Sequence, residues 1–166
     1  MTEFIYYCTI SGSSVHELPY GMDEEHPDCI SLKLALSEKI TELCNNGIID
    51  FYTNCEYGFS LWAAEAIVGM RGFREKPARL HIVVPFNEQV SKWHKEVRER
   101  YFKLHETADS VTVYSDSHYK GCYYDADRYM LNNSITLLTD GNSEYLEKHA
   151  ANNQKRIEFI FSCNTV

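Results

Sequence analysis

The chain has 166 residues, of which 44% are hydrophobic and 24% charged, a balance typical of one globular domain, which we expect to span residues 1–166. Its 24 acidic and 16 basic residues give a formal net charge of −8 at pH 7, which argues against nucleic acid or an anionic membrane surface as a partner. Because no apolar run reaches the roughly 18 residues of a membrane span and the first residues do not form a signal-peptide pattern, we expect a cytoplasmic protein.

Strand-like and helix-like patterns alternate along the chain. Residues 4–10 are β-branched and aromatic and end at the turn Ser11-Gly12, whereas Leu32 and Leu36 begin a run of apolar residues at helical spacing. In chain order, the patterns predict a strand at 4–10, a helix between 27 and 47, a strand at 48–53, a helix at 61–67, a strand at 80–84, a helix at 90–104, a strand at 111–114, a helix at 125–132, a strand at 135–138, a helix at 143–151 and a strand at 157–161. This alternation predicts an α/β, Rossmann-like, doubly wound domain with a mainly parallel sheet and helices on both faces.

A parallel sheet restricts where a ligand binds. The C-terminal ends of its strands meet at one edge, where helix N-termini present free N–H groups and partial positive charge. The loops expected at that edge are residues 11–20, 54–60, 85–89, 115–125 and 139–144. We therefore expect any small-molecule site to be built from these five loops.

Short motifs at these loops occur in an order known from one family. Residues 61–65 (Leu-Trp-Ala-Ala-Glu) follow a strand and a glycine turn, residues 85–89 read Pro-Phe-Asn-Glu-Gln, and residues 127–130 (Asp-Arg-Tyr-Met) precede the strand that ends at 139–141 (Thr-Asp-Gly). The chain thereby resembles the YpsA-like branch of the SLOG superfamily, mainly over residues 48–160. The resemblance implies a Rossmann-like fold distantly related to the phosphoribohydrolases that release free cytokinin bases. It also implies binding of nucleotides, nucleotide sugars or NAD-derived signals, and a homo-oligomer, since relatives commonly associate.

The chain departs from the family pattern at three turns. Residues 55–60 replace the family's Gly-x-x-Gly-x-Asp/Glu turn and keep only one of its glycines. Residues 11–15 lack the basic residue that follows the first strand in relatives, and residues 140–144 stand where related hydrolases carry Pro-Gly-Gly-x-Gly-Thr and a catalytic Glu. Since binding tolerates such losses better than chemistry that needs a placed base, they argue against that hydrolase reaction.

Several candidate residues have both a structural and a functional interpretation. Gly58 permits either a tight turn or close approach to a phosphate, and Ser60 is either the N-cap of the next helix or a ligand contact. Cys55 is either a small buried filler or a nucleophile whose pKa is lowered at a helix N-terminus. Glu56 and Glu144 are either surface carboxylates or a spaced pair for acid–base chemistry on a glycosidic bond.

Aromatic and basic residues near the same edge are equally ambiguous. Phe86 either stacks on a base or packs locally, and Trp93 is interpreted as a core residue on the apolar face of helix 90–104. Arg128, expected near the start of a helix beside the crevice, either binds a phosphate or pairs with a surface acid. The tyrosine-rich segment 118–124 suits a ligand or a protein partner. The six cysteines and seven histidines show no metal-ligand spacing, so neither a metal nor a cofactor is expected.

The sequence therefore predicts non-catalytic binding, for sensing or sequestration, of a nucleotide-related small molecule such as an ADP-ribose, NAD-derived or cyclic-nucleotide signal. Two alternatives stay open: a hydrolase of an N-glycosidic or phosphoester bond in a nucleotide, and a protein-interaction module that has lost its pocket. No residue is assigned a catalytic role. The predicted ligand-binding residues are Ser11, Gly12, Ser13, Ser14, Asn54, Cys55, Glu56, Gly58, Ser60, Pro85, Phe86, Gln89, Arg128, Asp140, Gly141, Asn142 and Ser143.

Overall fold

A computed structural model describes residues 6–73, 75 and 77–160. Within these residues the elements are β1 (Tyr7–Ile10), α1 (Pro27–Asn45), β2 (Asp50–Thr53), α2 (Phe59–Gly69), a short 3₁₀ helix η1 (Arg71–Phe73), β3 (Arg79–Val84), α3 (Lys95–Thr107), β4 (Ser110–Val113), α4 (Cys122–Asn132), β5 (Thr136–Thr139), α5 (Glu144–Asn152) and β6 (Arg156–Phe159). The predicted strand residues Phe4, Ile5 and Phe161 lie outside the described residues.

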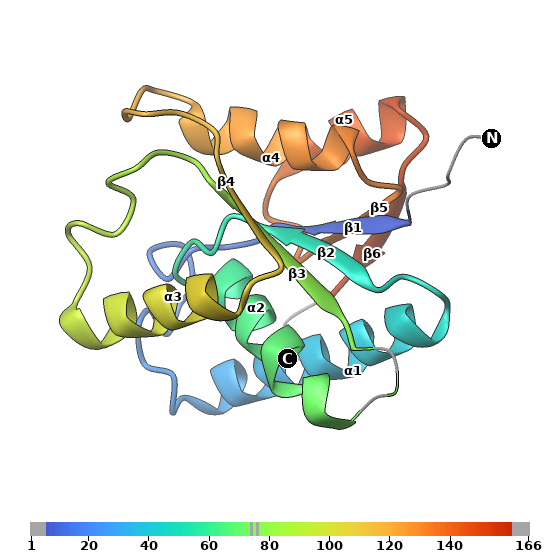
Figure 1. Ribbon diagram of the computed structural model, residues 1–166, viewed down its shortest axis with the longest axis horizontal. Helices are drawn as coiled ribbons and strands as arrows, with labels where there is room; N and C mark the ends of the chain where they lie inside the picture. The colour runs from blue at the N-terminus through green and yellow to red at the C-terminus, as the bar shows by residue number, and fades with distance from the viewer. Residues whose placement is uncertain (1–5, 74, 76, 161–166) are drawn as a thin grey trace.

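The strands form one sheet in the order β4-β3-β2-β1-β5-β6, and every neighbouring pair is parallel. From β1 the chain moves outward through β2, β3 and β4, and it then returns to place β5 on the other side of β1. Figure 1 shows α4 and α5 on one face of the sheet and α1, α2 and α3 on the other. The predicted α/β, Rossmann-like, doubly wound architecture is therefore confirmed. Its topological switch point, where such folds bind ligands, lies between β1 and β5.

The first helix shows how local sequence sets an element's ends. Pro27 occupies the first turn of α1, where its missing N–H costs nothing, and the His26 side chain accepts a hydrogen bond from the backbone N–H of Asp28 at 3.1 Å. The helix ends at Asn45 with Asn46 as its C-cap, and Gly47 follows with φ of +98°, the left-handed conformation expected after a helix. Both predicted ends of this helix are confirmed.

The start of α2 differs from the prediction. Gly58, not Ser60, is the N-cap of α2, so the interpretation of Ser60 as the cap is wrong. Ser60 lies inside the first turn, where it is buried and its carbonyl accepts a hydrogen bond from Thr53 Oγ1 at 3.2 Å. The helix starts earlier because Phe59 is itself buried and its N–H donates to the carbonyl of Ser13.

The start of α3 also differs. The helix begins at Lys95, and residues 86–93 form turns rather than the first part of a helix. Trp93 therefore lies in the loop before α3, although it still packs against the core, as predicted. The apolar residues before α3 continue its helical spacing because Val90 and Trp93 contact the same core as α3.

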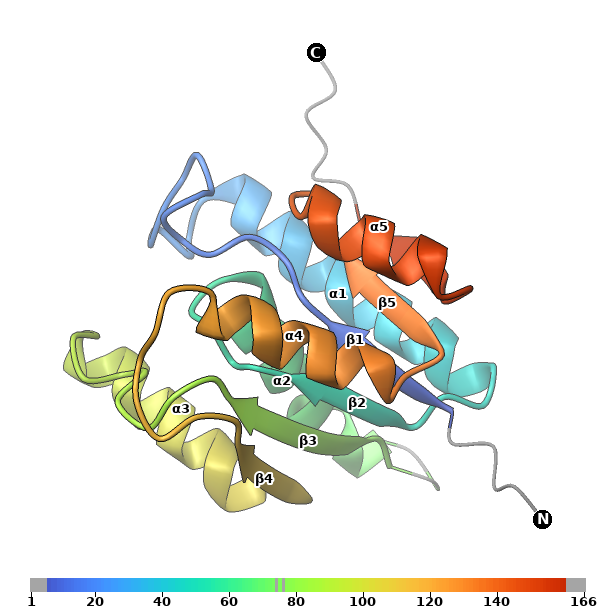
Figure 2. The ribbon, with the colours of Figure 1, turned by 90° about the horizontal axis from the view of Figure 1, so that it is seen from above.

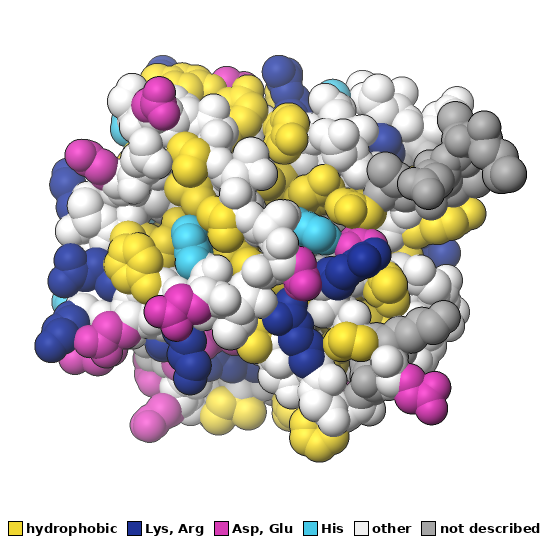
Figure 3. All heavy atoms as spheres, viewed as in Figure 1, with side chains coloured by type: hydrophobic (Ala, Val, Ile, Leu, Met, Phe, Trp, Pro, Cys, Tyr) yellow, Lys and Arg dark blue, Asp and Glu magenta, His cyan; other side chains and the backbone are white. Residues whose placement is uncertain are grey.

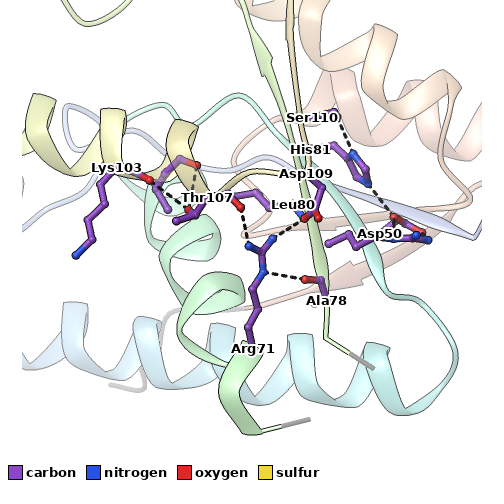
Figure 4. Close-up of polar contacts among 11 residues, drawn as sticks. Asp50, Arg71, Ala78, Leu80, His81, Lys103, Thr107, Asp109 and Ser110 are labelled. Atoms are coloured by element: carbon purple, nitrogen blue, oxygen red, sulfur yellow. Dashed lines mark hydrogen bonds and ion pairs between the residues drawn. The ribbon is translucent and has the colours of Figure 1, made fainter. Parts of the chain in front are cut away.

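A polar cluster joins the N-terminal ends of β2, β3 and β4. Asp50 accepts hydrogen bonds from Arg79 through Nε at 2.7 Å and Nη2 at 2.8 Å, and its Oδ1 lies 2.8 Å from His81 Nε2. The other ring nitrogen of His81 lies 2.7 Å from Ser110 Oγ, so one chain of contacts crosses three strands (Figure 4). The ring of Tyr7 stacks on His81 with 5.1 Å between centroids. This cluster holds the carboxylate of Asp50, which is nearly buried, beside a cation.

The edge strand β4 is exposed along its whole length. Val111 and Val113 are 43% and 45% exposed, and Tyr114 beyond the strand is 40% exposed. The face that carries this edge shows hydrophobic side chains at the surface between the two helix layers (Figure 3). Among the described residues there is no helix with the length and apolar character needed to cross a bilayer.

Candidate functional site

The loops after β1 and β2 are hydrogen-bonded to each other at the switch-point edge. The N–H of Val15 donates to the carbonyl of Tyr57 at 2.9 Å, and the N–H of Phe59 donates to the carbonyl of Ser13 at 3.0 Å. The loop after β5 joins them, because Asp140 Oδ2 accepts a hydrogen bond from the N–H of Ser13 at 2.9 Å. Three segments far apart in the sequence thus form one hydrogen-bonded rim.

Two glycines allow this close approach. A Cβ on Gly12 would lie 2.5 Å from the ring of Phe59, a fully buried side chain. Gly58 has φ of +136°, and a Cβ there would lie 2.5 Å from the carbonyl oxygen of Ser13. Both positions therefore require glycine for reasons of packing, and Gly58 also for its backbone conformation.

The carboxylate of Asp127, on α4, is fixed from two other elements. Ser11 Oγ donates to Asp127 Oδ2 at 2.7 Å, and Asn54 Nδ2 donates to Oδ1 at 2.8 Å. Asn54 is itself held, because its Oδ1 accepts the N–H of Glu56 at 2.8 Å and its carbonyl accepts Gln89 Nε2 at 2.9 Å. Burial raises the pKa of Asp127 to about 7, although the hydrogen bonds from Ser11 and Asn54 act in the opposite direction.

A pocket of about 280 Å³ opens above this carboxylate, at the C-terminal ends of β1 and β5. Figure 2 shows the loop after β1 passing between α4 and α5, the two helices that flank the pocket. We name it the carboxylate pocket, and its lining residues are Ser11, Gly12, Glu17, Glu56, Tyr123, Tyr124, Asp127, Asn142, Ser143 and Leu146.

The carboxylate pocket is acidic. Glu17, Glu56 and Asp127 line it, whereas no Lys, Arg or His belongs to its lining among the described residues. Burial raises the pKa of Glu56 to about 8, and the nearby carboxylates of Asp127 and Glu17 raise it further. Glu17 is partly anchored, since its Oε1 accepts the N–H of Ser14 at 3.0 Å. The pocket therefore offers hydrogen-bond acceptors and protonated carboxyls rather than positive charge.

Two further pockets adjoin it. One of about 360 Å³ shares Glu56 and Tyr123 with the carboxylate pocket; we name it the His16–Lys92 pocket. Its lining residues are Ser14, Val15, His16, Met22, Glu56, Tyr57, Lys92, Trp93, His94 and Tyr123. The other, of about 220 Å³, shares Glu17 and Asn142 with the carboxylate pocket and adds Ser13, Asp140 and Gly141. The three pockets form one crevice along the switch-point edge.

The structure places the predicted site residues in two large groups and leaves Phe86 and Arg128 apart from both. Nine of them line the crevice, namely Ser11, Gly12, Ser13, Ser14, Glu56, Asp140, Gly141, Asn142 and Ser143. Six are buried and do not belong to the lining of these three pockets, namely Asn54, Cys55, Gly58, Ser60, Pro85 and Gln89. Phe86 is half-buried and makes edge contacts with His118 and Tyr123, at 4.9 and 5.8 Å between ring centroids. The last, Arg128, belongs to none of the three linings.

Arg128 and Glu144 lie away from the crevice. Arg128 is in the middle of α4, not near its start, and its guanidinium donates to the hydroxyl of Tyr145 at 2.8 Å. Glu144 is exposed at the start of α5 and pairs with Lys148 at 2.9 Å, so it does not pair with Glu56. The carboxylates that interact with Glu56 are those of Asp127 and Glu17.

Cys55 does not have the environment of a nucleophile. Its side chain is fully buried, and burial raises the pKa of the thiol instead of lowering it. Its φ of +56° places the backbone in the left-handed region, where its N–H donates to Thr53 Oγ1 at 3.1 Å. The interpretation as a small buried filler is the one that fits, and the other described cysteines are buried as well.

Five residues that line the carboxylate pocket are not among the predicted site residues, namely Glu17, Tyr123, Tyr124, Asp127 and Leu146. Two signals pointed towards some of them: Asp127 begins one of the quoted motifs, and the two tyrosines end the tyrosine-rich segment 118–124. Glu17 and Leu146 carry no local signal, because only the packing of their loop and helix against the rim brings them to the pocket.

Comparison with known proteins identifies the family of this chain. Residues 8–163 match the family model described as the YspA SLOG family. The chain belongs to this family. The similarity to the YpsA-like branch of the SLOG superfamily inferred from the motifs is thereby confirmed.

Several curated relatives share the sequence at low identity. A UPF0398 protein of Brevibacillus brevis is 26% identical over 151 residues, which cover 86% of this chain and 79% of the relative. A UPF0398 protein of Halalkalibacterium halodurans is 29% identical over 113 residues, covering 68% of this chain and 59% of the relative. One of Macrococcus caseolyticus is 28% identical over 127 residues, covering 75% and 68%.

Proposed function

We propose that the carboxylate pocket binds the sugar and base of a nucleotide-related small molecule without cleaving it. The observation that carries the proposal is the carboxylate of Asp127, held by Ser11 and Asn54 at the switch-point edge. In dinucleotide-binding α/β folds, an acidic residue at this edge accepts hydrogen bonds from the ribose hydroxyls. Asp127 is pre-organised for that task, because both of its oxygens are oriented before a ligand arrives.

The remaining lining of the carboxylate pocket supports the same ligand class. Tyr123 and Tyr124 supply aromatic surface and hydroxyl groups, and Asn142 and Ser143 supply neutral donors and acceptors. The absence of a cation from the described lining disfavours a phosphate here, since the lining offers no positive charge to neutralise one. The part of a nucleotide that suits this pocket is therefore its nucleoside portion.

The residues of the loop after β5 favour binding without cleavage. The loop at 140–144 lacks the glycine-rich pattern of the related hydrolases, and Glu144 at its end faces solvent beside Lys148. A sensing or sequestering role requires only the pocket, whereas hydrolysis also requires a placed acid and a placed nucleophile or base.

A second candidate function is cleavage of an N-glycosidic bond. One observation favours it: Glu56 and Asp127, with pKa values raised to about 8 and about 7, face the same pocket. Two interacting carboxyls with raised pKa values resemble the acid and base arrangement of glycoside hydrolysis.

One experiment separates the two functions. Purified protein is titrated calorimetrically with nucleosides, nucleotides, NAD and ADP-ribose, and each mixture is then denatured and analysed by liquid chromatography. We expect saturable binding with the ligand recovered intact. Release of free base or ribose phosphate at a rate above that of a protein-free control would show cleavage instead.

A pair of matched variants locates the site. Asp127→Asn keeps the shape but removes the charge that accepts ribose hydroxyls, and we expect it to weaken binding by about tenfold. Glu144→Gln removes an exposed carboxylate of the same edge and should leave affinity unchanged. Equal affinities in both variants, or failure of every compound to bind the unaltered protein, would refute the proposal and favour a protein-interaction module.

A further inference from the structure

The crevice changes chemical character along its length. The carboxylate pocket is lined by three acidic side chains, but the adjoining His16–Lys92 pocket is lined by Lys92, His16 and His94. In a chain whose formal net charge is −8, a pocket lined by a lysine and two histidines is unusual. Acidic side chains thus line one pocket and basic side chains the adjoining one, with Glu56 in the lining of both.

The basic side chains of this second pocket are available to a ligand. Lys92, His16 and His94 are exposed, and within the described residues their side chains form no hydrogen bond or ion pair. Most other basic residues of the rim and helices have carboxylate partners; Arg100, for example, is held by Glu24 and Glu65. The positive charge of Lys92 is therefore not neutralised by the protein itself, and the two imidazoles are free to bind a ligand.

The backbone at the start of α3 adds partial positive charge to this pocket. His94 is the N-cap of α3, a helix of 13 residues, and its side chain does not cap the helix. The first amide N–H groups of a helix have no partner within the helix and carry partial positive charge. At α2, in contrast, the first N–H already donates to the carbonyl of Ser13.

We propose that the His16–Lys92 pocket is a phosphate subsite, which takes the anionic end of the ligand whose nucleoside portion lies in the carboxylate pocket. This inference rests on the proposed function and names the ligand class more narrowly: a nucleoside phosphate or a nucleotide derivative with its phosphate next to the ribose. The shared residues Glu56 and Tyr123 mark the junction. Trp93 and Tyr57 give the subsite an apolar wall, which lowers the local dielectric and strengthens its attraction for an anion.

Glu56 is compatible with an anion at this junction. Because burial and neighbouring carboxylates raise its pKa to about 8, Glu56 carries a proton over most of the neutral range. A protonated carboxyl donates a hydrogen bond to a phosphate oxygen instead of repelling it.

The test compares matched ligands by isothermal titration calorimetry: the four common ribonucleosides, their 5′-monophosphates and inorganic phosphate. We expect one monophosphate to bind at least about tenfold more tightly than its nucleoside, an advantage that shrinks as salt is raised from about 0.05 to 0.5 M. Two variants follow. Lys92→Gln combined with His94→Gln should cut the monophosphate advantage about tenfold, whereas Lys95→Gln, one residue further on and paired with Glu99, should leave it unchanged.

Each outcome decides between the two proposals. A nucleoside that binds no less tightly than its monophosphate overturns the phosphate subsite and leaves the nucleoside pocket standing. Phosphate or monophosphate binding that needs Lys92 and His94, without nucleoside binding, supports the subsite and overturns the nucleoside pocket. No binding of any of these ligands to the unaltered protein overturns both. Circular dichroism and thermal unfolding of each variant check that a lost affinity is not a lost fold.

Discussion

The two ends of the sheet treat acidic residues in opposite ways. At the N-terminal end, Asp50 is enclosed by the guanidinium of Arg79 and the imidazole of His81. At the C-terminal end, Asp127 receives hydrogen bonds only from the neutral groups of Ser11 and Asn54, and burial raises its pKa to about 7. One carboxylate has a cationic partner from the protein; the other has none.

This difference separates a structural cluster from a candidate binding site. A charge that the protein itself compensates contributes to holding strands β2, β3 and β4 in register (Figure 4). A carboxylate that is desolvated without a cation costs stability, and such groups gather at functional sites because a ligand can supply the missing partner. The comparison therefore predicts opposite responses when each end is altered.

The largest effect should come from the backbone of the crevice rather than from its charges. Gly58→Ala places a Cβ 2.5 Å from the carbonyl oxygen of Ser13, on a residue with φ of +136°. We expect it to lower the free energy of unfolding by at least about 3 kcal/mol, measured by denaturant titration. Gly47→Ala is the matched control: its φ is +98°, but nothing lies within 4 Å of the added Cβ, so the loss should be about 1 kcal/mol. Equal losses would show that the contact with Ser13 is not the cause.

Removing the carboxylate of Asp50, at the N-terminal end of the sheet, should lower the stability of the protein. Asp50→Ala leaves Arg79 and His81 without their acceptor, and we expect a loss of about 2 kcal/mol in the free energy of unfolding. The value stays below that of a fully buried pair because the Arg79 side chain is 53% exposed and can turn to water. Ligand affinity should be unchanged, because the cluster lies at the opposite end of the sheet from the crevice. An unchanged stability would contradict a structural role for the cluster.

Replacing Asp127, at the C-terminal end of the sheet, should change the stability of the protein in the opposite direction, and the size of the change should depend on pH. Because the pKa of Asp127 is raised to about 7, the folded protein keeps this proton where the unfolded chain has lost it. The resulting stabilisation is complete below about pH 4 and is lost as the pH rises through about 7. Asp127→Asn should therefore be about 1 kcal/mol more stable than the unaltered protein at pH 8 and no more stable at pH 4. Denaturant titrations of both proteins at pH 4 and pH 8 measure this difference in stability. A variant that is less stable than the unaltered protein at pH 8 would contradict the prediction.

The smallest effect is expected at Arg128, which sequence reasoning placed beside the crevice. Its guanidinium contacts the exposed Tyr145 and lies 3.9 Å from Asp125, outside the pockets. Arg128→Ala should leave the free energy of unfolding unchanged within the error of a denaturant titration and should change ligand affinity by less than about twofold. A tenfold loss of affinity for a nucleotide would instead show that Arg128 belongs to the binding site.

Much of the fold was predictable because periodicity and turn residues are local properties. The alternation of strands and helices, the parallel sheet and the left-handed Gly47 follow from residues within a few positions of one another. The predictions failed where an apolar residue outside a helix faces the same core, as at Trp93, and where a glycine rather than a serine begins a helix, as at Gly58. In both cases tertiary contacts, which local pattern does not contain, decided the boundary.

The sequence by itself determined the edge of the sheet at which the crevice forms, since parallel strands with short connections gather their C-terminal ends on one side. Only the tertiary structure decided which side chains meet there. Asp127 is separated from Ser11 by 116 positions and from Asn54 by 73, and no local pattern predicts that the three converge. The same holds for the division of charge along the crevice, because the field at each pocket depends on which distant side chains lie within a few ångströms and how far water is excluded.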